Sequence, residues 1–583
     1  MKQRLRLAAS APAAAGDSNI SKNSNSGSKS SSAARPRWLA LLTSPSGPFA
    51  MLLAALLSLA IAHWLFSTPF MRGITQFWQL QDNDIGQYLA GFNAFVREPW
   101  HWPLLRLESI NAPQGTLVTF LDAVPLYAVL LKLWQHGPDT PFRNPFAAWV
   151  GLCYALQGVG AWWLCREARL RAWMPLLAMT VLLALFAPLA IRIHHISLMS
   201  HWLLLFGLAA YLRGSRLGQV SVGAWTPLLL AAFYINLYLF CMLCLLFAAD
   251  LARDVVRAPR RTLMVAAAPA VLLAASLPAT MLPLGGGAGG GEWGFGYYSM
   301  NLLSPLAGGR TLKFPAMYAH DGQGEGFAYL GVFVIGATIY ALRLRARIDP
   351  GFWRRHRPLA WVLAFMTLYA ISNIVYLGKS ELFHLDLPAW TSRLTSVMRS
   401  SGRFFWPVGY ALTAFTVITL WRYQAPRRAA ALLAALLVLH IWDLGPHQRL
   451  VRDTVALGVT ERITQPVWNG FFGPSTRALQ VYPPFGCSKA SPTLTHLPTM
   501  LYAVKQRMTV STGYVARVKR PCDNYAAEIA THGTQATGFV FFKDDFAQRA
   551  EAEQLMGGPA AATCIEANFA WLCKRPAPAT LEK

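Results

Sequence analysis

Two aspartates, Asp82 and Asp84, follow the first long apolar segment of the chain and are its first candidates for chemistry. They precede a stretch that is dense in aromatic residues, among them Tyr88 and Trp100. A carboxylate in a partly desolvated cavity gains basicity, and it can take a proton from a hydroxyl group within about 3 Å. Aromatic residues also gather at membrane interfaces for structural reasons, so two solvated loop acids are the alternative interpretation.

A third acid, Asp122, lies in an apolar run three residues before Pro125. A carboxylate inside a membrane is costly, and such a residue is a functional candidate by default. It can instead satisfy backbone groups that the proline leaves unpaired. Asp122 is therefore a candidate catalytic residue with a structural alternative.

Arg192, His194, His195 and His201 cluster where two apolar segments meet. The spacing of the histidines is not a recognised metal-ligand pattern, so a divalent metal is possible but not indicated. Core or interfacial packing is the simplest role for these rings. Donation to a phosphate or sugar oxygen is the functional alternative, and we treat all four residues as candidate substrate-binding groups.

Arg399 and Arg403 lie four residues apart at the start of a later apolar segment, which places them on one face of a helix. Guanidinium groups suit bidentate recognition of phosphate, whereas snorkelling to the membrane interface is the alternative. The same side of the chain supplies Glu325, from a glycine-rich loop, and Lys379. We include both among the candidate substrate-binding residues.

The composition is that of a membrane protein. Of the 583 residues, 54% are hydrophobic and 14% are charged, whereas about 25% is usual in soluble domains. Apolar segments of roughly 18 or more residues recur, which is the length needed to cross a hydrocarbon core of about 30 Å. The net charge of +25 collects in short loops between these segments, as the positive-inside rule expects. We therefore infer contact with membrane lipids and no nucleic-acid partner.

The distribution of basic residues predicts the topology. The segment 117–135 is long enough to cross, but Asp122 and Pro125 interrupt it. If it crossed, the basic loop 166–171 would lie outside; if it dips or lies along the surface, every basic loop lies inside. We expect about eleven spans, a cytoplasmic N-terminus, and a helix over 85–96 lying in the membrane interface. The predicted spans are 48–66, 144–165, 174–192, 197–212, 224–237, 238–250, 262–284, 327–343, 359–378, 403–421 and 429–446.

Three further regions complete the predicted organisation. Residues 1–35 form a disordered cytoplasmic tail, because this polar segment cannot bury enough apolar area to fold. The transmembrane domain covers 48–446, with a first extracytoplasmic loop over 67–143. Residues 447–583 form a small periplasmic α/β domain with strand-like runs at 478–482 and 538–542 and a helix over 545–556 capped by its Asp.

Four cysteines in the C-terminal region predict up to two disulfides and an oxidising compartment. The close pair, Cys564 and Cys573, can staple a hairpin, which leaves Cys487 and Cys522. The other cysteines lie in apolar segments, where small packing residues are the simpler interpretation. The disulfides and the odd number of spans agree in placing the C-terminus outside the bacterial inner membrane.

Several motifs resemble those of a largely uncharacterised group of bacterial multi-pass proteins, regarded as glycosyltransferases of the GT-C superfamily. Asp84 matches the acid of this group because it stands seven residues before Gly91, and Asp122 matches a second acid. Ala123 departs from the pattern, which has Ser there. The matching segments are 84–92, 97–104, 120–126, 192–195, 201–202, 324–331 and 401–407.

The resemblance implies a fold and an activity. The fold is an all-α polytopic GT-C-like domain carrying the small α/β domain. The activity is transfer of a sugar, with inversion, from a polyprenyl-phosphate carrier to a glycan or lipid acceptor of the cell envelope, with Asp84 as base and Asp82 as a tuning neighbour. Apart from this lipid-linked donor, no cofactor is implied with certainty. A transporter or flippase of lipid-linked glycans, and a non-enzymatic envelope assembly protein, are the alternatives.

Overall fold

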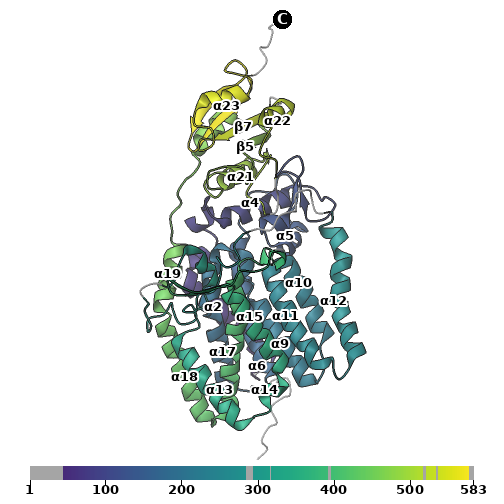
Figure 1. Cartoon of the computed structure of the whole chain (residues 1–583), viewed down its shortest axis with the longest axis vertical. Helices are drawn as coiled ribbons and strands as arrows, with labels where there is room; N and C mark the ends of the chain where they lie inside the picture. The colour runs from purple at the N-terminus through teal and green to yellow at the C-terminus, as the bar shows by residue number, and fades with distance from the viewer. Residues whose placement is uncertain are drawn as a thin grey trace, which may run out of the picture.

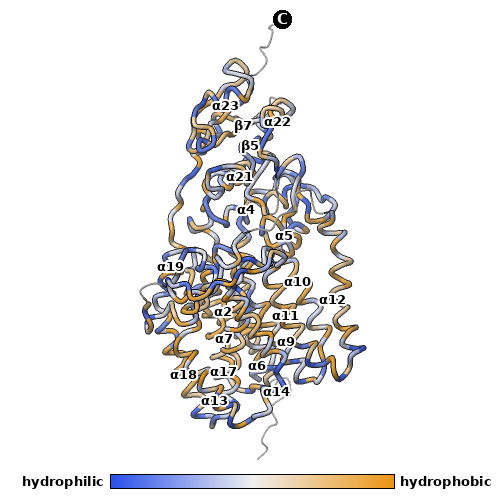
Figure 2. The backbone as a smooth tube through the Cα atoms, in the orientation of Figure 1, coloured by the Kyte–Doolittle hydropathy of each residue, from blue (hydrophilic) through white to orange (hydrophobic). Residues whose placement is uncertain are grey.

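A computed structural model describes residues 44–283, 293–314, 317–391, 395–516, 520–532 and 536–576. The predicted disordered tail over 1–35 lies outside these ranges. The chain forms a bundle of long helices, and a smaller part that contains a sheet stands at one end of it (Figure 1). Apolar residues dominate the length of the bundle, and hydrophilic segments gather at its ends (Figure 2).

Helix α2 (Pro48–Phe66) has the bounds predicted for the first span. Proline is favourable in the first turn of a helix, where its missing N–H needs no partner, and the chain leaves the helix at Ser67, whose φ is 74°. Five described helices are long and apolar enough to cross a membrane, or six if the pair bent by 49° over Pro426–Val455 counts as one span. The chain is therefore rich in membrane-length helices.

Each predicted span overlaps one or two described α-helices, but several helices are shorter than the predicted span, and the last part of 359–378 instead forms strand β3 (Ile374–Leu377). The apolar run over 224–250 breaks at Asn236, whose side-chain oxygen accepts from the backbone N–H of Tyr238 at 2.9 Å and caps the next helix. The helices are α6 (Phe146–Glu167), α7 (Trp173–Ala184), α8 (Ala187–Ile191), α9 (Trp202–Leu217), α10 (Val222–Ile235), α11 (Leu237–Asp254), α12 (Pro259–Thr280), α13 (Val332–Ile348), α15 (Arg357–Ile371), α17 (Trp406–Tyr423) and α18 (Pro426–Asp443).

Basic loops meet at one end of the bundle. Glu167, at the end of α6, accepts ion pairs from Arg213 at 3.5 Å and from Arg216 at 2.7 Å. At the end of α17, Arg422 donates to the carbonyl of Ala168 at 2.6 Å. These contacts bring the C-terminal ends of α6, α9 and α17 together, as alternation of the predicted spans requires. We call this the basic end of the bundle.

The segment 117–135 is too short in its helical parts to cross a membrane. It forms β2 (Thr116–Leu117), the 3-10 turn η2 (Val118–Leu121) and α5 (Pro125–Lys132). Eight α-helical residues extend about 12 Å, well below a hydrocarbon core of about 30 Å. This agrees with the prediction that the segment dips or lies along the surface.

Helix α4 (Asp84–Arg97) covers the predicted interfacial helix, but its surroundings differ from the prediction. All its residues from Ile85 to Val96 are buried, because α4 packs between α5 and helix α21 (His496–Lys505) of the C-terminal part. Gly91 lets α4 approach η2, since a Cβ there would stand 2.7 Å from the Cβ of Leu121. The protein, not an open membrane surface, covers the apolar face.

The C-terminal part contains a five-stranded mixed sheet in the order β6-β5-β7-β9-β8, with β5 parallel to β6 and β7 and the other pairs antiparallel. The two predicted strands are β5 and β7. Helices cover the sheet, and disulfides join Cys487 to Cys522 and, across the β8–β9 hairpin, Cys564 to Cys573. The elements are α20 (Gln465–Phe472), β5 (Ala478–Tyr482), β6 (Thr509–Val510), α22 (Tyr525–His532), β7 (Thr537–Phe542), α23 (Arg549–Leu555), β8 (Thr563–Ala567) and β9 (Ala570–Lys574).

Two details of this part differ from the sequence predictions. Helix α23 begins at Arg549, and Asp545 does not cap it: its carboxylate instead accepts from the backbone N–H of Lys489 at 2.8 Å and from the Ser488 hydroxyl. The polar residues after 446 do not at once enter the sheet domain. They first form α19 (Gly445–Val455), which packs against α2.

The sheet domain is joined to the first loop by backbone and side-chain contacts. Ile110 and Val510 form a parallel bridge, and the Arg97 guanidinium donates to the carbonyl of Val504 at 2.6 Å. The remaining short elements surround this junction or connect helices. They are α3 (Thr68–Met71), η1 (Gln76–Gln79), β1 (Arg106–Leu107), η3 (Arg192–His194), η4 (Ile196–Met199), η5 (Asp321–Gly326), α14 (Phe352–Arg355), β3 (Ile374–Leu377), β4 (Ser380–His384), η6 (Ala389–Thr391) and η7 (Ser401–Phe405).

The two disulfides should differ in their contribution to stability. Cys487 and Cys522 are 35 residues apart, whereas Cys564 and Cys573 are 9 apart. Loop-closure entropy then gives roughly 4 and 2.6 kcal/mol. We expect C487A/C522A to lower the free energy of unfolding more than C564A/C573A, as measured by pulse proteolysis of the full chain in urea. Equal losses would contradict the entropic account.

Candidate functional site

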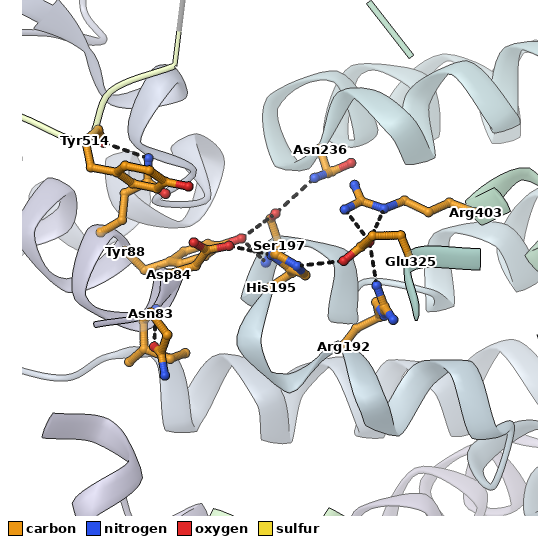
Figure 3. A network of polar contacts seen from close by, with 12 residues as sticks. Asn83, Asp84, Tyr88, Arg192, His195, Ser197, Asn236, Glu325, Arg403 and Tyr514 are labelled. Atoms are coloured by element: carbon orange, nitrogen blue, oxygen red, sulfur yellow. Dashed lines mark hydrogen bonds and ion pairs between the residues drawn. The ribbon is translucent and has the colours of Figure 1, made fainter. Parts of the chain in front are cut away.

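The candidate site is built around Asp84, in the first turn of α4. The preceding Asn83 caps the helix, because its side-chain oxygen accepts from the backbone N–H of Ile85 at 2.9 Å. The cap fixes the start of the helix and therefore the position of Asp84. The Asp84 carboxylate Oδ2 lies 2.8 Å from Nδ1 of His195 (Figure 3).

His195 stands between the short turns η3 and η4, where two apolar segments are interrupted. Its second ring nitrogen, Nε2, lies 3.2 Å from Oε1 of Glu325. The imidazole is thus held between two carboxylates that are 241 positions apart in the chain, one on α4 and one on η5. A ring with an anion on each side is favoured in its doubly protonated form.

Two arginines hold the far carboxylate. Glu325 Oε2 lies 2.6 Å from Nη1 of Arg192 and 2.6 Å from Nη2 of Arg403. Arg192 also donates to the carbonyl of Gly324 at 3.0 Å. Charge-assisted hydrogen bonds of this kind are stronger than neutral ones. We call Asp84, His195, Glu325, Arg192 and Arg403 the charged relay.

Arg403 reaches Glu325 because η7 approaches η5 very closely. A Cβ on Gly402 would stand 2.4 Å from the Cα of Gly326, so this approach leaves no room for a side chain at position 402. This close approach explains the Ser-Gly-Arg sequence at the start of the α17 segment. Arg403 also lies over the ring of Tyr238, with its Cζ 4.6 Å from the ring centroid.

The relay sets the charge of its members. Burial opposes ionisation of Asp84, but the hydrogen bond and positive charge of His195 outweigh it and hold the pKa below its ordinary value. Burial likewise opposes protonation of His195, yet Glu325 and Asp84 raise its pKa to about 9. Burial is also outweighed at Glu325, where Arg192, Arg403 and His195 hold the pKa well below the ordinary range. The relay thus combines two anions with three cations and carries a net positive charge.

A neutral hydrogen-bond chain runs beside the relay. The Tyr88 hydroxyl lies 3.0 Å from the Ser197 hydroxyl, to which the Asn236 amide donates at 2.9 Å (Figure 3). Through this chain α4 is tied to η4 and to the break between α10 and α11. The chain of hydrogen bonds therefore holds α4, η4 and the start of α11 close to Asp84.

A cavity of about 500 Å³ opens beside the relay, within the usual size of ligand sites. Asp84, His195 and Arg403 line it, and so do Asp122 and Arg399. Four of the predicted site residues therefore join Asp84 in its wall.

Asp122 stands in a strained turn of this wall. The φ angles of Asp122 and Val124 are 53° and 50°. This left-handed region is rare for a β-branched residue such as valine, and backbone strain of this kind clusters at functional sites. The turn between η2 and α5 thus directs Asp122 to the cavity.

The C-terminal domain closes one side of the cavity. Phe485, Tyr514 and Val515 belong to its lining. The carbonyl of Tyr514 accepts from the Gln87 amide at 2.9 Å, and the backbone N–H of Ala516 donates to the carbonyl of Phe120 at 3.0 Å. The cavity is consequently shared by the helical bundle, the first loop and the sheet domain.

The other predicted site residues lie elsewhere. Asp82 pairs with Arg462 at 2.9 Å, at the junction with the C-terminal region. His201 is buried, and its Nδ1 lies 2.9 Å from the Tyr410 hydroxyl, so its role is core packing. The structure places His194 against the Phe77 ring, and Lys379 exposed in the turn between β3 and β4.

Sequence reasoning missed Ser197, Asn236 and Tyr514 as part of the site. The position of Asn236 could have been noticed in the sequence, since a polar residue interrupts an apolar run there. No sequence pattern marks Ser197 or Tyr514, because their positions in the site depend on packing between distant segments. Among the described residues, no group of three or more His, Cys, Asp and Glu side chains has an arrangement that could hold a metal ion.

The charged relay predicts a pH-dependent stability. Because the pKa of His195 is raised to about 9 from an ordinary 6.5, its contribution is fully present below pH 6.5 and is lost as the pH rises through about 9. We expect the unfolding temperature of the purified protein to fall more steeply across this interval than that of H195Q. Parallel pH profiles for the two proteins would contradict the assignment.

Comparison with known proteins identifies the family of the chain but no relative of known function. A family model described as a domain of unknown function (DUF6311) matches residues 55–445. A second model, described as the DUF6311 C-terminal domain, matches residues 467–575. The gap between the two matches contains most of α19 and the link to the sheet domain. No curated protein matches the chain.

Proposed function

The chain belongs to the DUF6311 family, and we propose that it is a membrane glycosyltransferase of the GT-C type. It transfers a sugar from a polyprenyl-phosphate carrier to a glycan or lipid acceptor of the cell envelope, with inversion at the anomeric carbon. The observation that carries this proposal is that one cavity wall combines the carboxylate of Asp84 with the guanidinium groups of Arg399 and Arg403.

Asp84 is the proposed base. The acceptor hydroxyl gives its proton to Asp84 as its oxygen bonds to the anomeric carbon, and the bond from that carbon to the phosphate oxygen breaks. His195 occupies one carboxylate oxygen, Oδ2, and orients the group. Asp84 is ionised at neutral pH, which is the form that accepts a proton. Its lowered pKa differs from the gain in basicity that the sequence predicts, because His195 outweighs the effect of burial.

The arginines are the proposed phosphate-binding groups. A leaving phosphate gains negative charge, and fixed cations that face it stabilise that charge most in a water-poor cavity. The net positive charge of the relay favours such an anion. The Cζ of Arg399 lies 5.4 Å from the ring centroid of Tyr298, and this contact positions the guanidinium group in the cavity wall.

Topology supports a site on the outer side of the inner membrane. The basic end of the bundle lies at the far ends of α9 and α17 from the cavity, as the positive-inside rule expects of a cytoplasmic face. Two disulfides in the C-terminal domain favour an oxidising compartment for it. We therefore propose about eleven spans, a cytoplasmic N-terminus and a periplasmic sheet domain.

Asp84→Asn should slow transfer strongly, because an amide cannot accept the proton of the acceptor hydroxyl. We expect a rate lower by about 10² to 10⁴, measured as transfer of radiolabelled sugar from a polyprenyl-phosphate donor in proteoliposomes. Asp82→Asn is the matched control: it changes the same group two residues away, where the half-buried Asp82 pairs with Arg462 and does not line the cavity. It should retain transfer.

Full transfer activity in Asp84→Asn would exclude it as the base. If the wild-type protein moved the labelled lipid between leaflets and formed no glycosidic bond, the chain would be a transporter of lipid-linked glycans. The same proteoliposomes report both outcomes.

Arg399→Gln should weaken use of the lipid-phosphate donor. Loss of one charge-assisted contact costs roughly 1.5–3 kcal/mol, so kcat/KM for the donor should fall about 10- to 150-fold. Lys379→Gln removes the same charge from an exposed turn and should leave kcat/KM unchanged. If the two substitutions lowered kcat/KM equally, the loss would come from the overall positive charge of the protein. That result would contradict a direct contact between Arg399 and the donor phosphate.

A further inference from the structure

A second cavity, of about 480 Å³, lies at the basic end of the bundle. The ends of α6, α9, α13 and α17 form its wall together with α14 and the first turns of α15. Its lining residues are separate from those of the cavity beside Asp84. Helix α17 separates the two cavities, since it begins near Arg403 and ends at Tyr423.

The cavity extends deeply into the apolar part of the bundle. Its lining includes Ala411, which is twelve residues before the end of α17, and Leu208, which is nine before the end of α9. At 1.5 Å per residue the cavity reaches about 18 Å inward from the helix ends. The inner wall is apolar and includes Leu212, Leu363 and Phe415.

The outer part of the same cavity is strongly basic. Arg169, Arg216, Arg345 and Arg422 line it, with Glu167 as the one acid of the lining. Glu167 is already paired with Arg216. The lining therefore carries an excess of positive charge at the level of the helix ends and none deeper in the bundle.

Arg345 gives a second, independent sign of a ligand. Its side chain is buried, with 6% of the residue exposed, and its Nε has no hydrogen-bond partner within the part of the chain that the structure describes. One terminal nitrogen, Nη2, pairs with Asp349 at 3.0 Å. A buried donor without a partner is costly, and here it belongs to a cavity wall.

We propose that this cavity binds one anionic phospholipid from the membrane leaflet at the basic end. An acyl chain fills the apolar depth, and the phosphate lies between Arg345 and Arg169, where it accepts the hydrogen bond that Arg345 Nε lacks. A small water-soluble anion would leave about 18 Å of apolar cavity empty. A neutral lipid would leave the excess positive charge of the lining uncompensated. The proposal does not depend on the transferase activity.

The test is native mass spectrometry of the detergent-solubilised full chain with added phosphatidylglycerol. We expect R169Q/R345Q to bind this lipid about tenfold or more weakly than the wild type. R427Q/R428Q is the matched control, because it removes two exposed arginines at the same end that do not line the cavity. It should retain wild-type binding.

A second variant keeps the proposal testable if R169Q/R345Q fails to fold. Ala360 lines the cavity, and Ala360→Trp should exclude the acyl chain and abolish retention of the lipid while leaving every arginine in place. Unchanged phosphatidylglycerol binding in Ala360→Trp would overturn the proposal. Equal binding of zwitterionic phosphatidylcholine, or full competition by glycerol 3-phosphate alone, would overturn it as well.

Discussion

Asp84, His195 and Glu325 form a line of alternating charge, which Arg192 and Arg403 complete, at the place where four separate segments of the chain meet. Charges that leave water must find partners, because an uncompensated buried charge costs several kcal/mol. Each member of the relay therefore requires the others, and the ends of α4, η3, η5 and η7 are held at one level. The cavity beside Asp84 exists because these segments end together.

The remaining features of the site follow from that constraint. Gly402 and Gly326 let two backbones touch so that Arg403 reaches Glu325, and the interruption of the apolar segments around His195 frees its ring to bridge two carboxylates. The sheet domain then covers the open side of the cavity. Two cavities are thus separated by the length of α17. The cavity at the basic end combines arginines with an apolar depth, and the cavity at the relay end combines carboxylates and arginines with apolar side chains.

Local sequence patterns predicted the helices and strands well, but they did not predict which side chains contact one another. The apolar run beginning at Pro48 and the alternation over Ala478–Tyr482 are properties of continuous sequence, and their bounds agree with the structure. Asp82 and Asp84 look alike in sequence, yet only one faces the cavity, because Arg462, 380 residues away, pairs with the other. His195 and His201 differ for the same reason. Such choices depend on packing between distant segments, which a single sequence does not encode locally.

A structure of the protein with a polyprenyl-phosphate sugar donor bound would test the central claim most directly. The account predicts that the phosphate lies against Arg399 and Arg403 and that the anomeric carbon faces Asp84 across a space for one acceptor hydroxyl, with reacting atoms within about 3.5 Å once the acceptor is present. A donor bound with its sugar remote from Asp84, or with its phosphate away from both arginines, would contradict it.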